Sequence, residues 1–444
     1  MEQDVALDAL AKGANVVLQA PPGTGKTFCL MEAAKRVIDT CTDASVLIVA
    51  YNTELAAEVA NAIDGAGIGD SVKCYTFHGL CSQTIRLAAD DAALEDAIAY
   101  AREDISTRVQ VQSPTHVFID ESQDMTRLHV TLLNTVLVHS WLRQWFIVGD
   151  KELLLYDYGK YPSTLEFLSD PATYFKSERA WKRFALTKSM RITHPMAVLV
   201  DSHFETGLAS GKPMHPTTSA VCIHGAGKWN IGATVLSILR ASSTPPERIA
   251  ILAATKAANA PLKAALNTVS AGGHPLYVHG IDGAVDSIRR NKIRVSSFHA
   301  AKGTEVDIAI VILPKKIKRN PFYVAITRAR VELHIILVKD EFDPFVCRTL
   351  AHLTEDVAEN VSVVHTMDGL ARQIIAKSMM MSAEVLQDAQ DANVPSPARR
   401  IRALDNDRMS NNIPVVRGMV TTRAGHPIAA PDMVVSAKAS PFAS

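Results

Sequence analysis

The segment APPGTGKT, residues 20–27, constrains the fold of this chain more than any other feature. It follows an apolar run, Val16–Gln19, that predicts a buried strand, and it opens a helical pattern that begins at Lys26. A glycine-rich loop in this position can turn its backbone N–H groups inward, and the helix N-terminus adds partial positive charge. The segment therefore predicts a phosphate-binding loop, with Ala20 where the strict pattern has glycine.

A second segment, which is acidic, is expected to lie next to this loop. VFIDESQD, residues 117–124, ends a buried strand in two carboxylates. Next to a phosphate loop, Asp120 would bind Mg²⁺ and Glu121 would activate water, while Lys26 would bridge the β- and γ-phosphates and Thr27 would place its hydroxyl on Mg²⁺. We expect the loop contacts to come from Ala20, Pro21, Pro22, Gly23, Thr24, Gly25, Lys26 and Thr27.

Strand-like and helical patterns alternate along both halves of the chain, which predicts two α/β domains with parallel sheets. The predicted strands are Val16–Gln19, Val46–Ala50, Val72–Thr76, His116–Ile119, Trp145–Val148, Ile249–Ala253, Ile293–Ser297, Ile308–Leu313 and Val331–Val338. The predicted helices are Lys26–Ile38, Thr53–Ile63, Met125–Val138, Ala258–Leu266 and Pro321–Ala329. Residues 150–248 are expected to be mixed and mostly helical, and the polar tail from about 390 to be a flexible extension.

Composition narrows the class of protein only in part. Lys plus Arg equals Asp plus Glu, 46 each, so nothing indicates a protein that coats nucleic acid by bulk charge. A local basic groove stays possible because steering depends on the distribution of charge. We find no apolar run long enough to span a membrane and no secretory signal, and the six cysteines show no zinc-site spacing. We therefore expect a soluble, intracellular protein with no membrane partner.

Seven segments together resemble the motifs of UvrD/Rep-type superfamily 1 DNA helicases. AYNTELAAEV (50–59), TFHG (76–79), DESQD (120–124) and VGD (148–150) resemble motifs Ia, Ib, II and III. LTKSMRITHP (186–195), SSFHAAKGTEVD (296–307) and FYVAITRAR (322–330) resemble motifs IV, V and VI. The resemblance covers about residues 1–340.

This resemblance implies two RecA-like P-loop NTPase domains with ATP and Mg²⁺ bound in the cleft between them. The implied limits are 1–185 and 186–345 for the two domains, 346–390 for a helical extension and 391–444 for the tail. The resemblance makes Lys26, Glu121, Arg191 and Arg328 catalytic, with Arg191 on the γ-phosphate and Arg328 as the arginine finger. It adds nucleotide contacts at Gln3, Phe28, Gln123, Gly303 and Glu305.

A single strand of nucleic acid, DNA more than RNA, is the implied partner, held by stacking aromatics and backbone contacts. The implied contact residues are Tyr51, Asn52, Thr76, Phe77, His78, Tyr156, Tyr158 and His299. The tyrosines could equally be half-buried packing residues. The basic run Lys315–Arg319 could touch phosphates, serve as a nuclear address or be a solvated loop.

The chain departs from this family in several places. Leu153 stands where the family's motif III has the glutamine that senses the γ-phosphate, Met190 replaces the adenine-stacking aromatic, and Phe28 replaces a common arginine. We hypothesise that Phe28 takes over the base contact with Met190 opposite, which loosens base selectivity. The spacing leaves no room for the large accessory domains 1B and 2B. We therefore expect that separation of duplex requires a protein activator or self-association.

The sequence thus favours an ATP-dependent helicase or translocase, with 3′→5′ movement implied by family likeness alone. Two alternatives stay open. One is a superfamily 1 RNA helicase, which shares the phosphate chemistry. The other is a nucleotide-dependent nucleic-acid-binding protein whose motor has degraded, which Leu153 favours and the intact set of charged residues opposes.

Overall fold

The computed structural model describes residues 2–51, 53–85, 91–103, 114–137, 142–154, 162–204, 206–208, 221–254, 260–279, 291–340, 343–355 and 365–391. One compact unit comprises residues 1–379, and a second comprises residues 380–444. Three predicted nucleic-acid contacts, Asn52, Tyr156 and Tyr158, lie outside the described residues.

The first half of the chain forms a six-stranded sheet in the order β3-β2-β4-β5-β1-β6, in which all described pairings are parallel. Its strands are β1 (Asn15–Gln19), β2 (Val46–Ala50), β3 (Val72–Thr76), β4 (His116–Ile119), β5 (Gln144–Gly149) and β6 (Trp181–Ala185). Its α-helices are α1 (Glu2–Ala11), α2 (Lys26–Thr40), α3 (Thr53–Gly65), α4 (Phe77–Ile85), α5 (Asp91–Glu103), α6 (Arg127–Val136), α7 (Glu166–Ser169) and α8 (Pro171–Tyr174), with short 3₁₀ turns η2 (Ser122–Asp124) and η3 (Lys151–Leu153). The five strands predicted in this half are therefore confirmed.

A second sheet follows in the order β13-β7-β12-β11-β8-β10-β9, again with parallel pairings throughout its described strands. Its strands are β7 (Val221–Ala226), β8 (Ile249–Ala253), β9 (Leu276–Val278), β10 (Ile293–Ser297), β11 (Val306–Ile312), β12 (Ala329–Val338) and β13 (His365–Met367). Its helices are α9 (His194–Asp201), α10 (Ile231–Ala241), η4 (Pro246–Arg248), α11 (Ala260–Ala271), α12 (Arg319–Ile326), α13 (Pro344–Glu355) and α14 (Gly369–Asp391). Helix α12 ends at Ile326 and not at the predicted Ala329, because Ala329 already begins β12.

Both sheets wind in the same way. The order β3-β2-β4-β5-β1 in the first sheet repeats as β10-β8-β11-β12-β7 in the second. The fold is therefore α/β with two RecA-like parallel sheets, as predicted. The domain limits stay a proposal. Strand β13 lies in the segment predicted to be a helical extension, yet it pairs with β7 of the second sheet.

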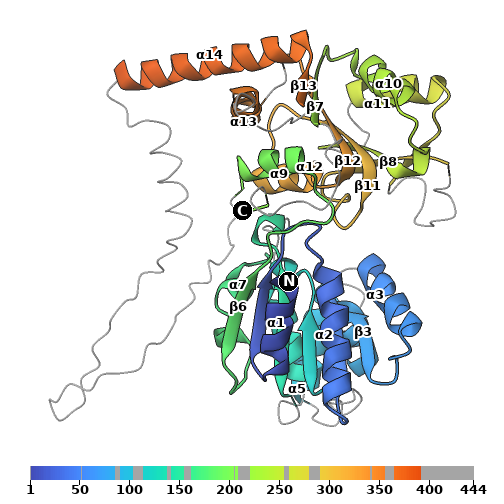
Figure 1. The fold of residues 1–444 in the computed structure, drawn as a ribbon, viewed down its shortest axis with the longest axis vertical. Helices are drawn as coiled ribbons and strands as arrows, with labels where there is room; N and C mark the ends of the chain where they lie inside the picture. Colours follow the sequence, from blue (N-terminus) through green and yellow to red (C-terminus); the bar gives the residue numbers. More distant parts are fainter. Residues whose placement is uncertain are drawn as a thin grey trace, which may run out of the picture. The chain divides into compact units, whose positions relative to one another are not determined.

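Apolar side chains cover both faces of each sheet, which explains the nearly continuous hydrophobic runs of the strands. In β2, Leu47 and Val49 pack with α4, α5 and α6, whereas Val46 and Ile48 pack with α1, α2 and α3. This alternation follows from the two-residue period of a strand. Figure 1 shows α1 and α2 side by side on the second of these faces. With both faces covered, the strand ends are the places left for ligands.

Two strands, β6 and β7, lie in the stretch predicted to be mostly helical, and neither of them was predicted. Strand β6 is an edge strand, and Lys182 and Arg183 on it are exposed, so no apolar alternation marks it. Strand β7 carries Cys222 and His224, which alternate with buried Val221 and Ile223. The exposed charges of β6 remove the signal on which strand prediction depends, whereas the short alternation Val221–His224 in β7 was a usable signal that the prediction missed.

The described residues contain neither a membrane-spanning helix nor a cluster of metal ligands. No helix among them combines the length and the hydropathy of a membrane span. No group of three or more His, Cys, Asp or Glu side chains in the described part of the chain is placed to hold a metal ion. All six cysteines lie among the described residues, and none of them is in a disulfide.

A buried histidine in β4 predicts a loss of stability in acid. His116 lies between Thr115 Oγ1 at 2.8 Å and Gln144 Oε1 at 3.2 Å, and burial lowers its pKa from 6.5 to about 4. Because the folded pKa is depressed, the neutral ring stabilises the fold above pH 6.5, and this contribution is lost as pH falls towards 4. We expect the difference in unfolding free energy between the wild type and His116→Gln to shrink by about 1.4 kcal/mol per pH unit below 6.5.

Urea denaturation of both proteins between pH 5 and pH 8.5 measures this difference, and the range above pH 7 serves as the internal control. A difference that stays constant down to pH 5 would contradict a neutral, buried His116.

Candidate functional site

The predicted phosphate loop connects β1 to α2. Gly23 and Gly25 adopt φ of 75° and 93°, a left-handed region that favours glycine. A Cβ on Gly23 would lie 2.4 Å from Cβ of Arg191 and 2.5 Å from Oγ of Ser189, so no side chain fits there. The two glycines therefore shape the loop, and Gly23 also lets Ser189 and Arg191, just before α9, pack against it.

Residues around the loop hold it in place. Lys26 Nζ donates to the Ala20 carbonyl oxygen at 3.2 Å and lies 3.8 Å from Glu121 Oε1. Thr24 is buried, and its hydroxyl donates to the Pro21 carbonyl oxygen at 2.7 Å. Gln3, predicted to read the base, donates to the Thr24 carbonyl oxygen at 3.2 Å. In this structure Gln3 thus supports the loop.

The two carboxylates after β4 differ sharply in environment. Asp120 is buried and accepts a hydrogen bond from the Glu121 N–H at 2.8 Å. Burial, and next the charge of Glu121, raise the pKa of the Asp120 carboxyl. Burial acts in the same direction on Glu121, but Lys26 and Lys302 outweigh it and hold the pKa of that carboxyl below its usual value. Glu121 is therefore the member of the pair that loses its proton more readily.

Glu121 also has a constrained backbone. Its φ is 48°, in the left-handed region that a residue with a side chain rarely adopts. The side chain accepts a hydrogen bond from Gln123 Nε2, which fixes the direction of the carboxylate. Such strain collects at functional sites, where the surrounding structure holds it in place.

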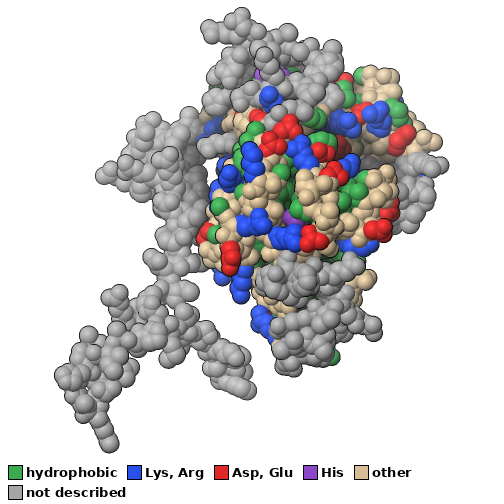
Figure 2. Space-filling model, turned by 60° about the horizontal axis from the view of Figure 1, so that its bottom comes forward, with side chains coloured by type: hydrophobic (Ala, Val, Ile, Leu, Met, Phe, Trp, Pro, Cys, Tyr) green, Lys and Arg blue, Asp and Glu red, His purple; other side chains and the backbone are tan. Residues whose placement is uncertain are grey.

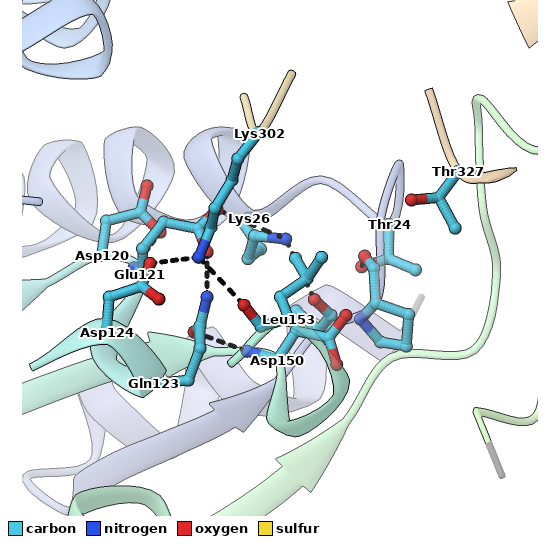
Figure 3. Close-up of polar contacts among 12 residues, drawn as sticks. Thr24, Lys26, Asp120, Glu121, Gln123, Asp124, Asp150, Leu153, Lys302 and Thr327 are labelled. Carbon is cyan, nitrogen blue, oxygen red and sulfur yellow. Dashed lines mark hydrogen bonds and ion pairs between the residues drawn. The ribbon is translucent and has the colours of Figure 1, made fainter. Parts of the chain in front are cut away.

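Asp150, at the end of β5, connects several of these groups. Its Oδ1 accepts from Gln19 Nε2 at 3.1 Å, its N–H donates to Gln123 Oε1 at 2.9 Å, and its Oδ2 accepts from the hydroxyl of Tyr323 at 2.8 Å. Burial is the main reason that its pKa rises to about 6. Sequence reasoning gave Asp150 no role, although its place after a buried strand in VGD was a usable signal. Figure 3 shows Asp150 beside Gln123.

Arginines of the second sheet approach the same loop. Arg191 forms an ion pair with Glu305, and Arg330 Nη1 lies 3.9 Å from Glu305 Oε2. Arg328 is buried and donates from Nε to the Val324 carbonyl oxygen at 2.9 Å and from Nη2 to Thr327 Oγ1 at 2.8 Å. Burial lowers its pKa to about 10, so it stays charged at neutral pH. Arg330 was missed, although it lies two residues from Arg328 in the same motif.

Lys302 links the second sheet to the first. Its ammonium forms a buried ion pair with Asp124 of η2 and donates to the Leu153 carbonyl oxygen at 3.1 Å. Leu153 itself is 2% exposed, and its side chain packs in the core of the second sheet. Leu153 is thus an apolar contact between the segment after β5 and the second sheet.

One cleft of about 380 Å³ unites these elements. Its lining comes from both sheets: Pro22, Gly23, Gly25, Lys26, Thr27, Phe28, Leu55, Glu121, Leu153, Met190, Arg191, Lys302, Gly303, Glu305, Arg328 and Arg330. Five of these side chains are basic and two are acidic, so the cleft suits a polyanion. Of the predicted nucleotide contacts, Gln3, Ala20, Pro21, Thr24, Asp120 and Gln123 are absent from this lining.

The predicted nucleic-acid contacts at the ends of β2, β3 and β10 differ in burial. Tyr51, Thr76, His78 and His299 are half-buried. Phe77 is 1% exposed, and its ring stacks on His129 at 4.3 Å between centroids. Phe77 therefore belongs to the core of the first sheet, and its contact with nucleic acid stays a prediction.

The surface around the described elements carries no single sign of charge on the face that Figure 2 presents. There, Lys and Arg side chains alternate with Asp and Glu side chains.

In the basic run, Arg319 donates to the His203 carbonyl oxygen at 3.0 Å and lies over the Phe204 ring at 5.0 Å, while Lys315, Lys316 and Lys318 are exposed.

Comparison with known proteins gives a partial match. A family model described as an AAA domain matches residues 3–158, roughly a third of the chain. A search of curated proteins finds no match. Among solved structures, the chain is similar to the Arterivirus nonstructural protein 10 helicase, at 15% identity and a TM-score of 0.41, over 78% of this chain and 64% of that one. A complex of the same Arterivirus helicase with DNA gives 14% identity, a TM-score of 0.42, and coverage of 78% and 65%. The chain thus spans slightly less than two thirds of the length of these helicases.

Proposed function

We propose that the protein is a nucleoside-triphosphate-driven motor that moves along single-stranded nucleic acid, with DNA favoured over RNA, and separates duplex. The observation that carries this proposal is the shared cleft. A phosphate loop with Lys26 and Glu121 from the first sheet faces Arg191 and Arg328 from the second. The match of residues 3–158 to an AAA domain supports a nucleotide-binding first half.

The residues of the cleft fit a nucleoside triphosphate. The left-handed φ values of Gly23 and Gly25 let backbone N–H groups of the loop turn towards phosphate oxygens. Thr27 and Asp120 offer the hard oxygen ligands that Mg²⁺ prefers, and the disfavoured charge of buried Asp120 is one that a cation would stabilise. A bound Mg²⁺ would neutralise phosphate charge during hydrolysis.

Each charged residue then has a distinct task. Lys26 binds the β- and γ-phosphates, and the charged Glu121 orients and deprotonates the attacking water. Arg328 neutralises charge that develops in the transition state, and Arg191 binds the γ-phosphate. In the structure Glu305 balances the charge of Arg191, so nucleotide binding requires Arg191 to exchange a carboxylate for a phosphate.

Hydrolysis would be coupled to movement through the two sheets. Lys26 and Glu121 belong to one half of the cleft and the arginines to the other, so both halves bind one triphosphate. Because the γ-phosphate is lost on hydrolysis, the attraction between the halves weakens, and the cleft opens. Alternating closure and opening moves a strand held by Tyr51, Thr76, His78 and His299, and the direction that we propose is 3′→5′. A protein activator or self-association would assist duplex separation.

A non-motor function is the second candidate, favoured by Leu153. Its burial in the core of the second sheet means that it offers no polar group to a γ-phosphate. If the motor has degraded for this reason, the protein would bind nucleotide and nucleic acid without turnover.

Steady-state hydrolysis of ATP with and without single-stranded DNA, and then with RNA, tests the proposal. We expect strong stimulation by DNA that is absent in Lys26→Ala. Stimulation by RNA alone would identify an RNA motor. Folded protein that binds ATP but does not hydrolyse it under any of these conditions would support the non-motor candidate.

The two exposed apolar residues of the cleft predict weak selection of the base. Phe28 is 59% exposed and Met190 is 45% exposed, and both line the cleft beside the loop. Apolar side chains stack on any base and offer no hydrogen bond to the edge of adenine. A binding site rejects a wrong base when polar groups of the site would be left without a hydrogen-bond partner, and these two side chains have no such group. We expect kcat/KM for ATP, GTP and CTP to agree within about 10-fold, and Phe28→Ala to raise KM for all three. Strict preference for ATP would contradict the apolar base site.

A further inference from the structure

Behind the lining of the cleft, a chain of hydrogen bonds runs from Glu121 to the second sheet. Glu121 accepts from Gln123 Nε2, and Gln123 Oε1 accepts from the Asp150 N–H at 2.9 Å. Asp150 Oδ2 then accepts from the hydroxyl of Tyr323 on α12 at 2.8 Å. Gln123, Asp150 and Tyr323 are each fully buried, so water does not compete for these bonds. Figure 3 shows Glu121, Gln123 and Asp150 close together.

The chain continues from Tyr323 to Arg328. Thr327 Oγ1 donates to the Tyr323 carbonyl oxygen at 2.8 Å and accepts from Arg328 Nη2 at 2.8 Å. Arg328 Nε donates to the carbonyl oxygen of Val324, the residue after Tyr323. The end of α12 therefore holds the guanidinium of Arg328, while the hydroxyl of Tyr323 ties the same helix to Asp150.

We propose that Tyr323 is a positioning residue, whose hydrogen bond to Asp150 fixes Arg328 relative to Glu121 across the cleft. This inference rests on the proposed function, because it concerns the two groups assigned to hydrolysis. The bond is charge-assisted, since a phenol donates to a carboxylate, and such bonds are short and directional. It joins residues 173 positions apart, one on each side of the cleft.

Packing alone is the competing explanation for Tyr323. Its ring lies 4.6 Å from the ring of Phe204 and belongs to the core of the second sheet. A residue that only packs would affect stability when altered, whereas a positioning residue affects the rate of the chemical step. Tyr323→Phe separates the two because it keeps the ring and removes only the hydroxyl.

In Tyr323→Phe we expect kcat for nucleotide hydrolysis to fall about 10- to 100-fold while KM changes less than about 2-fold. Tyr174→Phe is the matched control. It also removes a phenol that donates to a carboxylate, that of Glu166, but at the surface of the first half. We expect its kcat to equal that of the wild type.

Thr327 provides a second test within the same chain of bonds. Thr327→Val removes the oxygen between Tyr323 and Arg328, and Thr327→Ser keeps it. We expect kcat to fall in the valine variant and to be restored in the serine variant. Because both positions belong to one chain, Tyr323→Phe combined with Thr327→Val should lose no more than the worse single variant.

Each outcome of these hydrolysis measurements supports or overturns the positioning role of Tyr323. Wild-type hydrolysis with an unchanged kcat in Tyr323→Phe would overturn the positioning role and leave the proposed function intact. An equal loss in Tyr174→Phe would also overturn it, because the effect would then be general. Absence of hydrolysis in the wild type would remove the proposed function and this inference together.

Discussion

Replacing Arg328 with alanine is expected to lower kcat for nucleotide hydrolysis about 10³- to 10⁵-fold, the range by which an arginine finger accelerates phosphoryl transfer. The guanidinium lines the cleft that contains Lys26 and Glu121, and it remains charged despite burial. Because Arg328 is buried, water screens its charge poorly, so its effect on the transition state is large. Single-turnover hydrolysis beside equilibrium binding of a fluorescent ATP analogue measures the effect.

Two further variants make the result for Arg328 interpretable. Arg328→Lys keeps the charge but loses the planar fork that bonds Thr327 and Val324, so we expect kcat to stay at least about 10-fold below the wild type. Arg127→Ala, which removes an exposed arginine paired with Glu166, is the control. If Arg328→Ala hydrolyses at the wild-type rate while folded, the two halves do not share one catalytic site.

The second large effect is expected for Glu121→Gln, which should lower kcat about 10²- to 10⁴-fold, the usual contribution of a general base. The change keeps the size of the side chain and its contact with Gln123 but removes the negative charge that Lys26 and Lys302 maintain. An amide cannot accept the proton of the attacking water. Nucleotide affinity should change little or rise, because one negative charge near the phosphates is removed.

Glu32→Gln is the matched control for Glu121. Glu32 lies on α2 and pairs with Arg36 at 3.0 Å, away from the cleft lining. We expect its kcat to match that of the wild type. Trapping of bound ATP by Glu121→Gln on a filter would separate loss of chemistry from loss of binding. Normal turnover in this variant would require another base.

Local patterns in the sequence were sufficient for much of the fold. The strands β2, β3, β4, β8 and β10 begin and end at the predicted residues. In β2 and β8 every residue is apolar and buried, because strands buried on both faces read as continuous hydrophobic segments. The phosphate loop was equally predictable from the sequence, because its left-handed backbone positions favour glycine. Where that signal is absent, as in the charged edge strand β6, prediction failed for the same physical reason.

The candidate site was only partly readable. The motif resemblance indicated Lys26, Glu121, Arg191 and Arg328, and all four line one cleft. The resemblance could not show that Phe77 is buried, because a motif records which residue is present and not its exposure.

The sequence by itself determined two parallel α/β sheets, the phosphate loop and the residues available for chemistry. Tertiary structure alone decided which of them meet. Lys302 pairs with Asp124 across 178 residues, and Tyr323 bonds Asp150 across 173. Leu153, in the turn η3 after β5, packs in the core of the second sheet. Such contacts depend on how the two sheets pack together, and local periodicity contains no information about that packing.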